Sequence, residues 1–329
     1  MGAICPLFFI FNTKYYTMLI DYTKELQHFN KIRKGEIKEG YKLGIPEIDE
    51  YFRFKTGNFN VILGQANVGK TSMALYLMLL YSLRHNIRWV VFSSENEPYS
   101  IIRKLMEYLL AEPINKMSEE AYKYGTEVIR NYFKFISPEK LYTYKDLIRL
   151  AESYKAAWDY QGMLIDPYNS LIKDAEMSKT IDGHSYDYQA MTELRQFCKR
   201  NEISLWLNVH AVTSAIRMKH PIGHEYAGYG MPPSAGDVEG GAKFINRADD
   251  FLTFHRYTQH PSDWNVTHMH IRKTKETESG GRPTPLDNPI RLKSVLNNVG
   301  FEIDGENILK RVVHNKQEQK FAQANLRKA

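Results

Sequence analysis

Cysteine is nearly absent from this sequence of 329 residues, which contains Cys5 and Cys198 and no others. Two thiols this far apart cannot form a four-ligand zinc site, and they do not suggest a disulfide framework. We therefore expect two ordinary thiols in a reducing compartment, the cytoplasm, or the host cytoplasm if the chain is viral.

Long hydrophobic runs are missing as well. The apolar segment at residues 3–11 is too short to cross a bilayer, and no Lys or Arg precedes it, as one would in a signal peptide. Internal repeats and low-complexity tracts are also lacking, whereas 43% of the residues are hydrophobic and 13% are aromatic. The composition excludes collagen-like and disordered chains, and it predicts a globular protein with no membrane partner.

Composition divides the chain into three parts. Residues 1–40 are an N-terminal extension in which 19–40 predict a short, charged helical arm; we interpret Met18 as the true start and residues 1–17 as a start-site artefact. Residues 41–303 form the main domain. Residues 304–329 are a basic tail, which fits nucleic-acid binding or merely the solubility of a chain end.

The main domain alternates short apolar strands with longer helical stretches, which predicts an α/β fold, a mostly parallel sheet flanked by helices on both faces. One helix shows apolar or aromatic groups at the spacing of a single face, namely Tyr188, Met191, Leu194 and Phe197. A loop at Thr213–Gly236 is long enough to suggest a function. The expected strands are Phe59–Leu63, Arg88–Ser93, Gly162–Asp166, Ile203–Val209, Asp250–His255 and Thr267–Arg272, and the expected helices include Lys70–Leu83, Tyr99–Leu110 and Tyr186–Arg200.

A glycine-rich segment follows the first of these strands and precedes an apolar helix. This strand, loop and helix order is what a phosphate-binding loop requires, because the glycines let backbone N–H groups turn toward phosphate oxygens at a helix N-terminus. Lys70 can reach the terminal phosphates of ATP, and the Thr71 hydroxyl can bind Mg²⁺. The loop residues are Gly64, Gln65, Ala66, Asn67, Val68, Gly69, Lys70 and Thr71.

Three polar side chains end other predicted strands. Asp166 ends an apolar strand and is expected to hold Mg²⁺, the alternative being an ordinary turn before Pro167. Glu95 follows another strand and is a candidate to polarise the attacking water, with Glu97 as its rival. His210 could contact the terminal phosphate, although a single His at a strand end is often structural.

These parts, in this order, resemble the RecA-like motor domain of DnaB-type replicative helicases, a group that includes phage primase-helicases and Twinkle. The resemblance covers residues 40–303. It implies that Glu95 is the catalytic carboxylate, that Asp166 is linked to Mg²⁺ and that His210 senses the phosphate. The segments that carry it are residues 44–51 with Gly57, 92–96, 165–168, 236–242 and 246–250.

The resemblance also implies two sets of cations. Arg217, Lys219 and His220 lie where the family grips single-stranded DNA, the alternative being a solvated mobile loop. Lys273 and Lys275 take the places of a Lys and an Arg that reach the ATP of the neighbouring subunit. Lys does not replace a guanidinium fully, so either Lys275 serves or Arg272 is recruited by a register shift.

We therefore expect an ATP- and Mg²⁺-dependent DNA helicase that moves on single-stranded DNA as a homo-oligomeric ring, a hexamer, in phage-like replication. About 40 residues precede the motor, too few for the family's usual N-terminal domain, so a separate primase or loader is an expected partner. The alternatives are a RecA- or RadA-like recombination ATPase and a nucleotide switch that loads or assembles other proteins without unwinding DNA.

Overall fold

A computed structural model describes residues 22–36 and 39–314. The hypothesis of a late start at Met18 falls outside these residues, as do Cys5 and the last part of the basic tail. Contacts divide the chain into two units, residues 1–39 and residues 40–329. In the first unit, helix α2 (Tyr22–Arg33) places Tyr22, Leu26 and Phe29 on one exposed face.

The second unit is built around one sheet of ten strands in the order β10-β9-β8-β7-β6-β1-β5-β4-β2-β3. The strands from β3 to β6 in this order run parallel, and the other four are antiparallel. Parallel strands buried on both faces read as continuous apolar runs, which is the pattern of β1, β2 and β4. The strands are β1 (Phe59–Gly64), β2 (Trp89–Ser93), β3 (Phe133–Phe135), β4 (Gly162–Asp166), β5 (Ser204–His210), β6 (Asp250–Arg256), β7 (Val266–Thr274), β8 (Ile290–Ser294), β9 (Phe301–Ile303) and β10 (Glu306–Asn307).

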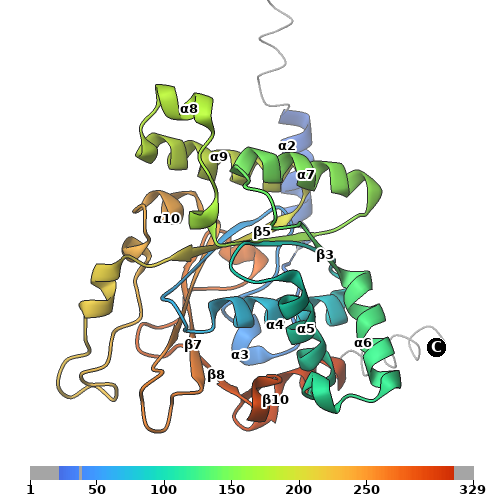
Figure 1. The fold of residues 1–329 in the computed structure, drawn as a ribbon. Coiled ribbons are helices and arrows are strands. Elements are labelled where there is room, and N and C mark those ends of the chain that lie inside the picture. Colours follow the sequence, from blue (N-terminus) through green and yellow to red (C-terminus); the bar gives the residue numbers. More distant parts are fainter. Residues whose placement is uncertain (1–21, 37–38, 315–329) are drawn as a thin grey trace, which may run out of the picture. The chain divides into compact units, whose positions relative to one another are not determined.

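Helices cover both faces of this sheet, as Figure 1 shows. One hydrophobic cluster joins the sheet to α3 (Pro46–Asp49), α4 (Lys70–His85), α5 (Pro98–Leu110) and α6 (Glu119–Tyr132), and it includes Trp89 packed edge-on against Trp206. The opposite cluster includes α7 (Tyr144–Ala157), α9 (Gly183–Asn201) and α10 (Lys243–Arg247), with α8 (Ala175–Thr180) beside them. The expected α/β fold with helices on both faces is therefore confirmed.

The six expected strands and three expected helices are all present, with ends that differ by three residues or fewer. The expected apolar face of α9 is wrong at Tyr188, which is exposed and stacks on Arg247. A repeat of three residues drifts around a helix of 3.6 residues per turn, so the buried face instead runs through Tyr186, Ala190, Met191, Leu194, Phe197 and Cys198.

The boundary expected after residue 303 is also wrong. Strand β10 follows it, and residues 308–314 are helical, with Ile308 and Val312 completely buried in the cluster around α4. Arg311 makes a two-pronged ion pair with Glu47 of α3, at 3.0 Å for each prong. The described part of the supposed tail is therefore a packed element of the main domain. No helix in the described ranges combines the length and the apolar character needed to cross a membrane.

Candidate functional site

The phosphate-binding loop turns sharply between β1 and α4. Asn67 and Gly69 have φ angles of 62° and 84°, in the left-handed region that favours glycine. A Cβ atom on Gly64 would lie 3.0 Å from the backbone oxygen of Phe254, so the close approach of loop and β6 also requires glycine. The side-chain Nε2 of Gln65 is buried and has no hydrogen-bond partner among the described residues, and the backbone turn at a helix N-terminus fits a polyphosphate.

Lys70 is the first residue of α4 and points back across the carboxyl end of the sheet. Its Nζ donates to the backbone oxygen of Val209 at 3.2 Å and lies 3.4 Å from Nδ1 of His210. Burial lowers the pKa of the Lys70 ammonium, and the carboxylates of Asp166 and Glu95 partly oppose this. An incoming phosphate would supply the negative charge that the buried ammonium lacks.

Asp166 ends β4 and is fully buried. Its Oδ2 accepts hydrogen bonds from Thr71 Oγ1 at 2.8 Å and Ser93 Oγ at 3.4 Å, and its Oδ1 accepts one from Asn208 Nδ2 at 2.6 Å. Burial raises the pKa of this carboxyl, and the bonds from Asn208 and Thr71 counter that rise.

Thr71 and Asp166 form a set of hard oxygen donors that suits Mg²⁺, which commonly takes one or two protein ligands together with phosphates and waters. Within the described residues, no three His, Cys, Asp or Glu side chains are grouped to hold a metal by themselves. The donor set therefore fits a magnesium ion that arrives with its nucleotide, and it fits no preformed structural metal site.

Glu95 and His210 face each other beside the phosphate loop. His210 Nε2 lies 3.1 Å from Glu95 Oε1, while its Nδ1 faces the Lys70 ammonium. Because Lys70 can only donate, His210 accepts at Nδ1 and donates from Nε2 to Glu95. The structure thus joins Lys70, His210 and Glu95 in one hydrogen-bonded chain.

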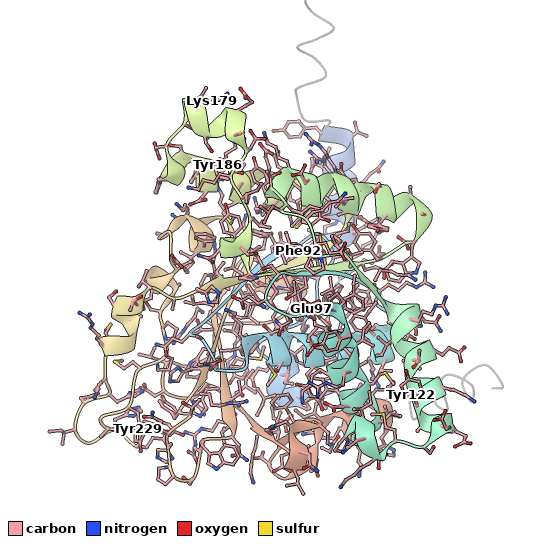
Figure 2. All side chains as sticks on the ribbon, viewed as in Figure 1. Phe92, Glu97, Tyr122, Lys179, Tyr186 and Tyr229 are labelled. Carbon is pink, nitrogen blue, oxygen red and sulfur yellow. The ribbon has the colours of Figure 1, made fainter. Side chains whose placement is uncertain are left out.

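The rival carboxylate, Glu97, lies farther along, immediately before α5. It is the N-cap residue of that helix, and its side chain makes no capping hydrogen bond. Figure 2 marks Phe92 at the end of β2 and Glu97 at the start of α5. Glu95 is therefore the candidate that the contacts favour.

Three polar residues near the loop were not expected from the sequence. Asn208 and Ser93 both bond to Asp166. Arg256, at the end of β6, places a guanidinium nitrogen 3.1 Å from where a Cβ of Gly69 would lie. The available signal was a polar residue inside or ending a buried strand, a signal applied to Asp166 and His210 but not to these residues.

The expected DNA-contacting residues lie on the 211–238 loop, which follows β5 and contains Tyr229, labelled in Figure 2. Arg217 and Lys219 are exposed. His220, in contrast, is buried; its Nε2 lies 2.8 Å from the Tyr257 hydroxyl, and its ring stacks on His224 at 3.9 Å. Burial lowers the pKa of His220, so this residue is a neutral anchor of the loop and not the phosphate-binding cation expected.

The three cations that are candidates to reach the ATP of a neighbouring subunit make different contacts. Lys273 Nζ donates to the backbone oxygens of Ile245 and Ala248, at 2.6 and 2.8 Å, at the end of α10. Arg272 sits at a β-bulge, since the ladder with β6 skips from Lys273 to Ile271, and it lines a pocket under the 211–238 loop. Lys275 is half exposed and lies 3.8 Å from Asp249.

Comparisons with known proteins agree with this fold. No family model matches the chain. It is 23% identical over 255 residues to the "Twinkle homolog protein, chloroplastic/mitochondrial" of Arabidopsis thaliana, a match that covers 73% of this chain and 34% of the relative. The chain thus spans about a third of that relative's length.

Two solved structures share the architecture. The "ATPase Domain of G40P" aligns with a TM-score of 0.67 at 13% identity, covering 85% of this chain and 98% of that one. A structure described as "a DnaB-Like Replicative Helicase And Its Interactions With Primase" aligns with a TM-score of 0.65 at 13% identity, covering 86% of this chain and 66% of that one. The chain has the fold of these ATPase domains, as the sequence resemblance implied.

Proposed function

We propose that this chain is an ATP-driven DNA helicase motor that works in DNA replication. The observation that carries the proposal is the continuous chain from Lys70 through His210 to Glu95, set beside the Thr71 and Asp166 pair. A buried ammonium, a carboxylate for water and a hydroxyl–carboxylate pair for a metal are the parts that hydrolysis of a triphosphate needs. The likeness in sequence to the Arabidopsis Twinkle homolog and in fold to a DnaB-like replicative helicase supports the same assignment.

Each of these residues has a separate task in the proposed reaction. The loop amides and Lys70 hold the β- and γ-phosphates of ATP, and Glu95 orients and polarises the attacking water. Thr71 and Asp166 hold the Mg²⁺, which, when bound, neutralises charge that builds up on the phosphate oxygens. His210, between Lys70 and Glu95, exchanges one of its partners when the γ-phosphate leaves.

The site is proposed to be completed by a second copy of the chain, in a ring that is a hexamer. Lys275 is the favoured trans cation because its side chain is half exposed, whereas Lys273 is held by its own α10 and Arg272 lines a pocket. A separate primase or loader remains the proposed partner. The cytoplasmic location and the phage-like setting stay predictions, and the Arabidopsis relative carries an organellar name.

Single-stranded DNA is proposed to lie along the 211–238 loop. Arg217 and Lys219 are its exposed cations and are placed to contact phosphates, while His220 ties the loop to Tyr257. Movement of this loop after hydrolysis would then carry the strand.

The first test is turnover of ATP by the purified chain with and without single-stranded DNA. We expect DNA to raise the rate and Lys70→Ala to abolish it, while Lys104→Ala, which removes a partly buried ammonium bonded to Asn298 and Glu107, leaves it unchanged. A rate that is indifferent to DNA would refute the motor and leave the ATPase. Displacement of a strand from a forked duplex would exclude the alternative of a nucleotide switch that does not unwind DNA. Closed rings in electron micrographs would exclude a RecA-like recombination filament.

A further inference from the structure

A second hollow lies beneath the 211–238 loop and shares no residue with the phosphate-binding site. Its volume is about 710 Å³. It is lined by residues within 215–226 and 231–237 of the loop, by Tyr257, by β7 and by the segment at and before the start of β8. This size is typical of sites that take a small organic ring system, which run from roughly 300 to 1,000 Å³.

Two polar groups in its lining have no partner in the described part of the chain. Both ring nitrogens of His270 and the Nε of Arg272 are buried and unbonded, and His270 is only 2% exposed. Burial lowers the pKa of His270 to about 2, so its ring is neutral and offers one donor and one acceptor. Native proteins rarely leave such groups without a partner, so a ligand with donors and acceptors at its edge is indicated.

The remaining lining suits a flat ring. Tyr257 stacks on Tyr226 at 3.8 Å, and both border the pocket. The lining also contains the apolar Met231, Pro232, Pro233 and Pro289, together with the charged Glu225, Asp237, Asp287 and Arg291. Apolar walls with a few fixed polar groups are the usual arrangement for binding an aromatic heterocycle.

Residues 217–220 of the 211–238 loop carry two exposed cations and two residues that line the pocket. Arg217 and Lys219 are exposed, while Met218, which is 54% exposed, and His220, which is buried, line the pocket. Arg217 ends a short 3-10 helix, and Lys219 pairs with Gly230 across the loop. Two exposed cations and part of the pocket lining therefore lie on one short segment.

We propose that this pocket receives one base of a single-stranded nucleic acid whose phosphates contact Arg217 and Lys219. Arg272 donates to an acceptor on the base edge, and His270 donates or accepts beside it. Every base edge carries both kinds of group, so a strong sequence preference is not expected. The inference rests on the proposed function, since it assigns a site for the strand that the motor would move.

The experiment compares two fluorescent oligonucleotides of equal length and charge, oligo-dT and an abasic phosphodiester chain. Binding is measured by anisotropy with the full chain, magnesium and a non-hydrolysable ATP analogue. We expect oligo-dT to bind at least about fivefold more tightly than the abasic chain, as base stacking and base contacts require.

Two variants assign this difference to the pocket. His270→Phe keeps an aromatic ring and removes both nitrogens. It should lower the ratio of the affinity for oligo-dT to the affinity for the abasic chain, and it should leave ATP turnover without DNA unchanged. Lys219→Gln should weaken both oligonucleotides equally and reduce the salt dependence of binding by about one unit of slope.

Equal affinities of wild-type protein for the two chains would overturn the base pocket and leave the helicase proposal standing. An unchanged ratio in His270→Phe would do the same. If neither oligonucleotide binds, the DNA motor itself fails, and the base pocket fails with it.

Discussion

At the scale of the residue, the side-chain amide of Asn208 supports the carboxylate that is proposed to hold magnesium. Asn208 Nδ2 donates to Asp166 Oδ1 at 2.6 Å, and both side chains are completely buried. Without this donor, burial would be opposed mainly by Thr71 and Lys70, so the pKa of Asp166 would rise further and its neutral form would be favoured. A hydrogen bond to a charged group contributes about 1.5–3 kcal/mol.

Asn208→Leu is therefore expected to raise the magnesium concentration for half-maximal nucleotide binding by about tenfold or more. The measurement is a titration of Mg²⁺ with a fluorescent ATP analogue at fixed protein concentration. Asn60→Leu is the matched control, because Asn60 is equally buried but bonds to Ser204, away from Asp166. If both variants need the same extra magnesium, the support assigned to Asn208 is wrong.

The core of the phosphate site was predictable from the sequence because its residues are close together along the chain or end strands that the sequence marks plainly. Asn208 was not recognised because its partner lies 42 positions away and its strand reads as apolar. His220 was assigned to DNA contact, with Arg217 and Lys219, because the resemblance places this loop there. Its hydrogen bond to Tyr257 is one that no local pattern indicates. Local periodicity cannot predict hydrogen bonds between residues that are far apart in the sequence.

At the scale of the element, the strand β7 carries buried histidines that must stay neutral. Burial lowers the pKa of His268 to about 4 and that of His270 to about 2. Because these folded-state values lie below the unfolded value of about 6.5, stability is complete above pH 6.5 and falls as the pH drops below it.

His270→Phe should remove the share of this acid sensitivity that His270 contributes. Between pH 6.5 and pH 5, the stability of the wild type should fall relative to the variant by about 1 kcal/mol per pH unit, with the slope approaching about 1.4 at the acid end. Urea unfolding followed across this range measures the difference. Parallel curves for the two proteins would show that His270 does not titrate in this way.

The helical residues 308–314 offer a second test at this scale. Val312 is fully buried against the α4 cluster, whereas the adjacent Val313 is 40% exposed. Val312→Asp should destabilise the domain by more than about 3 kcal/mol, since it buries a charge without a partner, and Val313→Asp should change stability by about 0.5 kcal/mol or less. Thermal unfolding compares them, and equal effects would place residue 312 outside the core.

The antiparallel half of the sheet was only partly predictable. Strand β7 was expected, but β8, β9 and β10 are short, and β8 alternates buried and exposed residues. Their place is fixed by successive pairing, β8 with β7, β9 with β8 and β10 with β9, by the α4 cluster and by the Arg311–Glu47 ion pair. The sequence after residue 303 is rich in basic residues, and a basic composition does not distinguish a packed helix from a solvated tail.

At the scale of the whole molecule, the proposed trans role of Lys275 makes activity depend on assembly. Specific ATP turnover should rise with protein concentration, because a separated chain lacks its neighbour's cation. Lys275→Ala chains mixed into wild-type protein should lower turnover more than in proportion to their fraction. Turnover that is strictly proportional, at concentrations where sizing shows mixed oligomers, would remove Lys275 from this role.

Arg256 and Tyr257 are consecutive residues that reach in different directions. The first rests against Gly69 of the phosphate loop, and the second holds His220 of the 211–238 loop. A small displacement of β6 would therefore change the contact with the phosphate loop and the contact with the 211–238 loop together. In the proposed motor, this one peptide unit would couple the nucleotide site to the loop proposed to contact DNA.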